Sequence, residues 1–229
     1  MRSGWTWLLL GWLMPAALAH AEPAPLQVDV VSSSFVLPGK IARLDALGAP
    51  AGVRFRQRVV DPATALPDGW PAGSDLVLLD TPRPTDVEQV TAVAEGPLQN
   101  GKVPWLRVGG GAPASGQLPA EVAGRIAGYY GNGGEANIRT LAAYLQAWRS
   151  GTGTGGLPLP QPLPATGYST GGSQWLDNPH ALQAQWQRDN QATWPKVAVL
   201  ISGSMLSGMQ TQVLDALIEA GRARKVALF

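Results

Sequence analysis

The chain has 229 residues, with 17 basic and 16 acidic side chains, two histidines and no cysteine. This near balance of charge argues against a nucleic-acid surface, which needs a basic excess to neutralise phosphates. The absence of cysteine from the sequence excludes disulfides, thiolate catalysis and cysteine-based metal centres. Because the sequence also holds no self-contained catalytic motif, we predict no catalytic and no metal-ligating residue in this chain.

Residues 1–21 have the pattern of a secretory signal peptide. Arg2 precedes a short apolar run that Pro15 interrupts, and small residues follow up to Ala21. The run is shorter than the roughly 20 residues that a membrane span needs, so we favour cleavage after Ala21 over an uncleaved anchor helix. The mature chain would be exported or periplasmic, without a transmembrane span. It would keep 16 basic and 16 acidic residues and a single histidine, His180.

Residues 22–149 predict an α/β lobe of the Rossmann or flavodoxin-like kind, built on a parallel sheet. Strands are expected where apolar residues alternate or run together, at 26–31, 53–60, 75–80 and 103–108. Helices are expected where apolar residues recur every three or four positions, at 38–47, 85–94, 119–128 and from about 135 to 148. The apolar run between Asp75 and Asp80 is typical of a buried parallel strand. Pro104 indicates that its strand lies at an edge of the sheet or begins at this residue.

Two stretches of this lobe allow more than one interpretation. Arg54, Arg56 and Arg58 alternate along one strand, and we favour the solvated face of an edge strand over an anion site. The glycine-rich stretch 109–116 follows a strand, as phosphate-binding loops do. It lacks the G-x-G-x-x-G spacing and is interrupted by Pro113. We therefore favour a plain loop over the carboxyl end of the sheet.

The turn Asn132-Gly133-Gly134 separates two predicted helices. Glycines tolerate the left-handed conformation that often ends a helix, and the next helix is expected from about Glu135. Its apolar face comprises Ile138, Leu141, Ala142, Leu145 and Trp148. The candidate ligand-binding residues of this region are Asn132, Gly133, Gly134 and Asn137. For Asn137 we favour local hydrogen bonding over contact with a ligand.

Residues 150–167 form a Gly/Thr-rich and then Pro-rich stretch that we interpret as a flexible and then extended link between domains. The alternative is a surface loop packed against the body of the protein. Residues 168–229 are predicted to begin a second α/β lobe, with a short helix at 177–188. Because the chain stops at an exposed parallel strand, we expect it to be the front part of something longer.

The second lobe is predicted to contain a strand–helix–strand unit. Residues 194–202 are predicted as the clearest buried strand of the chain, 205–220 as a helix, and 225–229 as the start of another strand. Ligands of such units lie at the carboxyl end of the strands. The second set of candidate ligand-binding residues is therefore the turn Ser202, Gly203 and Ser204.

Three stretches together resemble a known family: 129–145, the Pro-rich 157–167, and 196–220 with Gly208 and Asp215. Their order is similar to that in the amino-terminal region of the cobaltochelatase large subunit, the CobN and magnesium-chelatase H family. There an NGG-x-x-N helix precedes a proline-rich link, a G-x-Y-H-P-like turn, a V-G-I-L-F-like strand and an x-D-A-L-I helix. The resemblance covers about residues 120–229, whereas 22–119 match only in being α/β.

The resemblance implies a part in inserting a divalent metal, cobalt or magnesium, into a tetrapyrrole. In the CobN branch this is cobalt insertion into a corrinoid during cobalamin biosynthesis. It implies ATP-dependent, ligase-class chelation in which AAA+-type partner subunits bind the ATP. That agrees with the absence of a P-loop from this sequence. The resemblance supplies no cofactor and no catalytic residue to this chain, which we expect to be inactive in isolation.

Two features depart from the family. After Gly167 and Tyr168 the chain continues with Ser169 and Thr170, where the family has His-Pro. The signal peptide would also place the protein outside the cytoplasm, the family's usual location and the source of ATP. These departures favour an exported relative that handles metal or tetrapyrrole. The alternative is a periplasmic α/β module that captures a ligand, without catalysis, between two lobes joined near 150–165.

Overall fold

The computed structural model describes residues 24–61, 66–162, 166–171, 175–203, 205 and 208–229. The predicted signal peptide, residues 1–21, lies outside these ranges. Within them, no helix combines the length and the apolar character that crossing a membrane requires. We call residues 24–162 the first lobe and residues 166–229 the second lobe.

The first lobe is organised around a five-stranded sheet with strand order β2-β1-β3-β4-β5. Its strands are β1 (Leu26–Ser32), β2 (Val53–Val59), β3 (Leu76–Asp80), β4 (Trp105–Val108) and β5 (Ala114–Gly116). The first four strands run parallel, and β5 pairs antiparallel with β4. The order β2-β1-β3-β4 is the flavodoxin-like arrangement, so the predicted α/β fold with a parallel sheet is confirmed.

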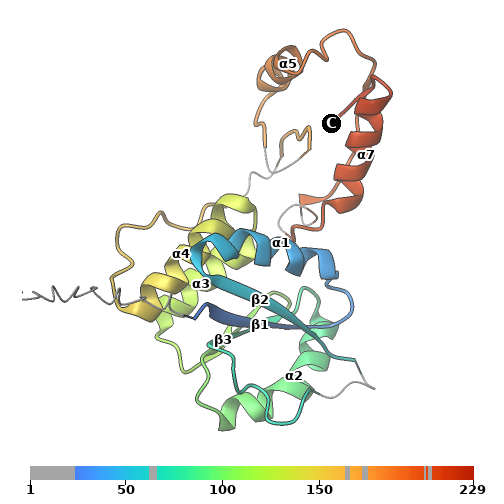
Figure 1. Cartoon of the computed structure of the whole chain (residues 1–229). Coiled ribbons are helices and arrows are strands. Elements are labelled where there is room, and N and C mark those ends of the chain that lie inside the picture. Colours follow the sequence, from blue (N-terminus) through green and yellow to red (C-terminus); the bar gives the residue numbers. More distant parts are fainter. Residues whose placement is uncertain (1–23, 62–65, 163–165, 172–174, 204, 206–207) are drawn as a thin grey trace, which may run out of the picture.

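Helices cover both faces of this sheet (Figure 1). One face carries α1 (Pro38–Gly48), α3 (Ala120–Asn132) and α4 (Glu135–Ser150), whose apolar side chains share one core cluster with β1 and β3. The other face carries α2 (Pro84–Asn100), which packs with Trp70 and Trp105. The 3-10 turn η1 (Ala49–Ala51) joins α1 to β2. Helix α2 extends six residues beyond the predicted range, because Leu98 continues its buried face.

The burial and pairing of two strands can be compared with their predictions from the sequence. Every residue of β3 is buried, as the apolar run between two acids predicts. Strand β2 lies at the edge of the sheet, and its arginines are paired with acids. Arg56 and Arg58 both contact Asp29, and Arg54 binds Asp45. This agrees with the edge-strand interpretation.

The glycine-rich stretch 109–116 is a loop only in its first part. Ala114–Gly116 forms β5, which corrects the prediction of a loop throughout. Backbone pairing with β4 produces this strand. Because the pairing decides it, the sequence of three small residues alone does not predict the strand. Gly110 has a φ of 46°, and a Cβ there would lie 2.4 Å from the carbonyl oxygen of Thr81. The close approach to the backbone just after β3 therefore requires glycine.

The Pro-rich stretch packs against the first lobe up to residue 162. The Tyr129 hydroxyl donates to the carbonyl of Pro158, and Arg125 donates to the carbonyl of Leu157. Asn137 holds Gln161 from both sides, since Nδ2 donates to its carbonyl and Oδ1 accepts from its backbone N–H. These are contacts of an ordered surface segment. A domain boundary in this stretch stays a prediction.

The second lobe has less regular structure than the sequence predicts. It contains α5 (Pro179–Arg188), α7 (Gln212–Ala223) and the two-residue strands β6 (Lys196–Val197) and β7 (Ala227–Leu228), which pair in parallel. The prediction of a long buried strand at 194–202 is wrong, because Leu200 is 100% exposed and β6 is exposed as well. An apolar strand is buried only if other elements cover it, and the described residues supply β7 alone. Of the predicted helix 205–220, residues 212–220 are helical in α7, residues 208–211 are not helical, and residues 206–207 lie outside the described residues.

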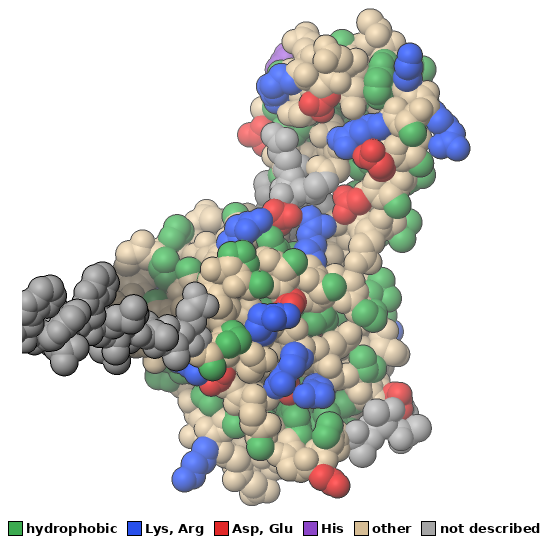
Figure 2. Space-filling view, in the orientation of Figure 1, with side chains coloured by type: hydrophobic (Ala, Val, Ile, Leu, Met, Phe, Trp, Pro, Cys, Tyr) green, Lys and Arg blue, Asp and Glu red, His purple; other side chains and the backbone are tan. Residues whose placement is uncertain are grey.

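The two lobes meet at a narrow neck. Figure 1 shows α5 and α7 projecting away from the sheet of the first lobe, and the space-filling view of the same face shows the constriction between them (Figure 2). No described helix or strand of one lobe packs extensively along an element of the other. On this face basic and acidic side chains are interspersed rather than gathered by sign, as the charge balance leads one to expect.

Candidate functional site

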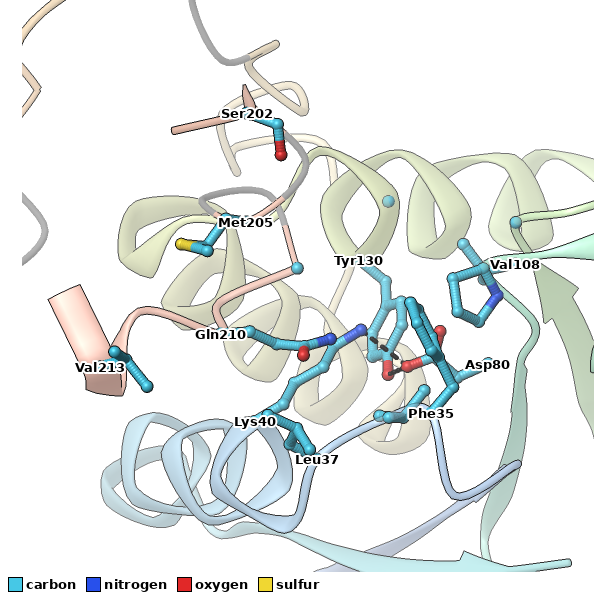
Figure 3. Close-up of a pocket in the computed structure, with 15 residues that line it drawn as sticks. Phe35, Leu37, Lys40, Asp80, Val108, Tyr130, Ser202, Met205, Gln210 and Val213 are labelled. Atoms are coloured by element: carbon cyan, nitrogen blue, oxygen red, sulfur yellow. Dashed lines mark hydrogen bonds and ion pairs between the residues drawn. The ribbon is translucent and has the colours of Figure 1, made fainter. Parts of the chain in front are cut away.

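A cavity of about 450 Å³ lies at the neck, between the carboxyl edge of the sheet and the beginning of the second lobe (Figure 3). The first lobe contributes its floor and one wall, and the described residues Ser202, Met205, Gly208, Gln210 and Val213 contribute the opposite wall. Its lining is mainly apolar, with a few polar groups at one end. The lining residues are Phe35, Val36, Leu37, Lys40, Asp80, Pro82, Val108, Gly109, Tyr130, Gly131, Ser202, Met205, Gly208, Gln210 and Val213.

The position of the cavity follows from the sheet topology. Strand β1 leads into α1 on one face of the sheet, whereas β3 leads into α2 on the other. The chain therefore leaves the neighbouring ends of β1 and β3 in opposite directions. A crevice remains between them, and this switch point is where open α/β sheets bind ligands. Asp80 is the last residue of β3, and Lys40 lies in the first turn of α1.

The polar end of the cavity is a buried trio, Lys40, Asp80 and Tyr130. Lys40 Nζ lies 2.6 Å from Asp80 Oδ2, and the side chains are only 9% and 6% exposed. The Tyr130 hydroxyl donates to the same oxygen at 2.8 Å. The Lys40 ammonium also lies 4.7 Å from the centre of the Tyr130 ring, a cation–π contact. Figure 3 shows the three side chains converging from α1, β3 and α3.

The trio fixes the protonation of Tyr130. Burial raises the pKa of its hydroxyl well above the ordinary value, and the nearby Asp80 carboxylate raises this pKa further. The hydroxyl therefore stays protonated near neutral pH and serves as a hydrogen-bond donor rather than as a base. Asp80 accepts from both neighbours, so the trio forms a rigid, charge-balanced floor.

The rim of the cavity is held by a second network. The Arg83 guanidinium lies 3.9 Å from the centre of the Phe35 ring, and Arg83 also binds the buried Asp86 through two nitrogens. The Ser33 hydroxyl donates to Asp86 Oδ1, the oxygen that also accepts from Arg83 Nη2. Hydrogen bonding to Arg83 is the main cause that lowers the pKa of Asp86. The network fixes Phe35, which is half exposed, beside the cavity.

The second lobe closes the cavity from the other side. Met205, Gly208, Gln210 and Val213 line it, and in Figure 3 the Gln210 side chain reaches toward the Lys40–Asp80 pair. Met209 is buried in the core cluster of the first lobe, so this wall is anchored by an apolar contact. The cavity thus depends on both lobes.

The candidate residues predicted from the sequence fall into separate places. Ser202 lies on this cavity, whereas Gly203 lines a second cavity of about 390 Å³ within the second lobe. Ser204 lies outside the described residues. The turn Asn132-Gly133-Gly134 is not part of either lining, although it directly follows Gly131 of the first cavity. Gly133 ends α3 with a φ of 64°, which is the predicted helix-end role.

Asn137 is engaged in local hydrogen bonds. Besides Gln161, its side chain donates to the Gly133 carbonyl one turn earlier, at 2.8 Å. These bonds are local to the α3–α4 turn and the Pro-rich segment, as we favoured. A role of Asn137 in ligand binding stays a prediction.

Sequence reasoning missed the trio itself. Asp80 carried a usable signal, because it ends an apolar strand and such ends meet at the ligand edge of the sheet. Lys40 gave none, since a lysine in the first turn of an amphipathic helix normally faces solvent. Tyr130 was hidden in the Tyr129-Tyr130 pair, where both rings fit a helix core.

The arrangement is suited to binding a small molecule. A volume of this size falls within the roughly 300–1,000 Å³ of ordinary ligand pockets, which combine apolar walls with few polar groups. Among the described residues, no group of three acidic or histidine side chains could hold a metal ion. The polar end can offer hydrogen bonds from Lys40 and Gln210 to a bound molecule.

Comparison with known proteins gives a likeness of fold. No family model and no curated protein matches the sequence. Among solved structures, the catalytic subunit of cobaltochelatase from Mycobacterium tuberculosis superposes with a TM-score of 0.50 at 20% sequence identity. The match covers 90% of this chain and 16% of that subunit. The chain therefore shares the fold of a small part of a cobaltochelatase subunit.

Proposed function

We propose that this chain is part of a cobaltochelatase-like subunit that binds a tetrapyrrole or corrinoid into which metal is inserted. The observation that carries the proposal is the cavity at the switch point, with its apolar walls and the polar Lys40, Asp80 and Gln210 at one end. The fold likeness to a cobaltochelatase subunit supports it, as do the family-like stretches of the sequence.

The chemistry of the cavity suits one edge of such a macrocycle. A tetrapyrrole combines a flat apolar ring with polar arms at its edge. The apolar side chains of Val36, Leu37 and Val108 would contact the ring, and the polar end would receive an arm. Burial of apolar surface drives binding of this kind, whereas the few polar groups set the orientation.

The remaining parts of the reaction belong to other components in this proposal. The metal, cobalt or magnesium, is the cargo; in the family that the sequence resembles, AAA+-type partner subunits bind and hydrolyse ATP. The role of this chain is to hold and orient the macrocycle. We propose that it does so after export, where a partner system other than the cytoplasmic ATPase would have to supply energy.

An absorbance titration tests the proposal. A cobalt-free corrinoid and a metal-free porphyrin are each titrated with the purified chain, and transfer of the ring into an apolar site should shift its visible absorption bands. Saturation at a one-to-one ratio is expected. The absence of any shift at high protein concentration would overturn the proposal. Metal insertion by the purified chain alone is expected to be absent.

A second candidate, an exported ligand-binding module without catalysis, is favoured by one observation. The cavity is lined from both lobes, as in proteins that capture a ligand between two lobes. Binding of small polar molecules, with no response to either macrocycle, would favour this candidate. A thermal-shift screen over amino acids, sugars and metal-free macrocycles separates the two.

A further inference from the structure

We infer that Arg43 is the latch that keeps the second lobe closed over the cavity. The inference concerns regulation of the site described above and rests on the proposed function for the identity of the ligand. The latch itself is a property of the ligand-free chain, so it can be tested without that ligand.

Arg43 is the side chain through which α1 reaches the second lobe. Its Nη1 donates to Thr211 Oγ1 at 3.1 Å and lies 3.4 Å from Asp215 Oδ2. Its Nη2 lies 2.9 Å from Glu135 Oε1 at the beginning of α4. One guanidinium therefore joins two helices of the first lobe to the start of α7.

The partners of the latch are themselves ordered. Thr211 is buried, and its hydroxyl donates to Asp215 Oδ2 at 2.8 Å, so the two residues present one joint acceptor surface to Arg43. The planar fork of a guanidinium can serve partners in two directions at once, which a lysine cannot do with the same geometry. Arg43 is suited to this junction because its donors diverge.

The rest of the junction is small. Met209 inserts into the core of the first lobe. A Cβ at Gly39 would lie 1.5 Å from Gln212 Nε2, so the end of the Gln212 side chain packs directly on the backbone of α1 there. No described helix or strand of one lobe packs extensively along one of the other. Because this junction is small, the Arg43 contacts should contribute a large share of its stability.

The latch is coupled to the cavity through α1. Arg43 lies one turn after Gly39 and Lys40 on that helix. The segment that Arg43 and Met209 hold in place carries Gln210 and Val213, which form the far wall of the cavity. Release of the latch would therefore let this wall move away from the Lys40–Asp80 pair and open the cavity to solvent.

The absence of cysteine from the sequence makes the test direct. Spin labels are attached to cysteines introduced by Ala92→Cys on α2 and Gln187→Cys on α5, two exposed positions in different lobes. Pulsed dipolar spectroscopy then gives the distribution of distances between the labels. The protein with Arg43 intact is expected to show one narrow distribution. Arg43→Met and, independently, Asp215→Asn are expected to broaden it and to add longer distances.

The matched control is Arg54→Met. Arg54 pairs with Asp45 of the same helix α1, away from the second lobe, so its loss should leave the distribution unchanged. Circular dichroism confirms that each variant is folded. An unchanged distribution in Arg43→Met would overturn the latch, whatever the macrocycle titration shows. If the latch variants broaden the distribution and no macrocycle binds, the latch stands and the proposed function fails.

Discussion

Asp80 Oδ2 accepts from both Lys40 Nζ and the Tyr130 hydroxyl, at 2.6 and 2.8 Å, at the carboxyl end of β3. A single carboxylate oxygen thus joins α1, β3 and α3. A buried ammonium without its counter-charge is costly. The order of the cavity floor should therefore depend on this one side chain.

Asp80→Asn should destabilise the chain by about 3 kcal/mol, because it leaves the Lys40 ammonium buried beside a neutral group. Urea unfolding measures the change. The control is Asp45→Asn, whose partner Arg54 is half exposed and whose ion pair should contribute about 1 kcal/mol or less. The double variant Lys40→Met with Asp80→Asn should recover part of the loss. An Asp80→Asn cost no larger than that of the control would contradict the account.

Tyr130 should make the stability of the chain fall at alkaline pH. The pKa of its hydroxyl is raised in the folded state, so above a pH of about 10 the unfolded chain loses this proton while the folded chain keeps it. This contribution to stability is complete below pH 10. It is lost above that value by about 1.4 kcal/mol per pH unit, until the folded pKa is reached.

The comparison variant is Tyr130→Phe, which has no hydroxyl to ionise. Between pH 10 and pH 11, the free energy of unfolding of the variant should rise by about 1 kcal/mol relative to that of the unsubstituted protein. Between pH 7 and pH 9 the two curves should run parallel. Parallel curves over the whole range would show that the Tyr130 hydroxyl is not buried as described.

Asn137→Ala should release the Pro-rich segment from α4. The substitution removes both hydrogen bonds to Gln161 and leaves the Gln161 N–H without its acceptor, a loss of about 2 kcal/mol. Hydrogen exchange at the Gln161 amide should become faster. Thr140→Ala is the control, because that exposed hydroxyl only bonds back to Ala136 one turn earlier. Equal exchange rates of the Gln161 amide in the two variants would contradict the role of Asn137 in holding the Pro-rich segment.

Substitution of Gly133, at the end of α3, and of Gly124, within α3, should change the stability with opposite signs. Gly133→Ala places a side chain at a φ of 64° and a ψ of −160°, a conformation that costs a non-glycine residue about 1–3 kcal/mol. Gly124→Ala lies in the helix interior with open space around its Cβ position. It should stabilise the chain by about 0.5–1 kcal/mol. Thermal unfolding of both variants checks the contrast.

The sequence was informative where local chemistry decides the structure. The apolar run that ends at Asp80 is buried as predicted, and the glycines after Asn132 end their helix as expected. Pro38 begins α1 and Pro84 begins α2, because proline fits the first turn of a helix.

The sequence did not predict the features that depend on residues distant along the chain. The stretch 194–202 is apolar enough for a core strand, but Leu200 is fully exposed because no described element covers it. Lys40 is buried only because Asp80, 40 residues later, supplies its counter-charge. Pairing of this kind has no local pattern, and so the centre of the candidate site could not be predicted.

A pair of variants on one helix tests whether the macrocycle binds in the cavity at the neck. Gly131 lines the cavity, and a Cβ there would meet only Val108, at an ordinary 3.5 Å. Gly131→Phe should therefore fill the cavity without disrupting α3. Gly124→Phe makes the same change on the same helix, in open space.

The measurement is the absorbance titration of a cobalt-free corrinoid with the unsubstituted protein and both variants. We predict a saturable shift with the unsubstituted protein and with Gly124→Phe, and an at least tenfold weaker affinity with Gly131→Phe. Equal shifts with all three proteins would place the ligand elsewhere, and no shift with any of them would contradict the proposed function.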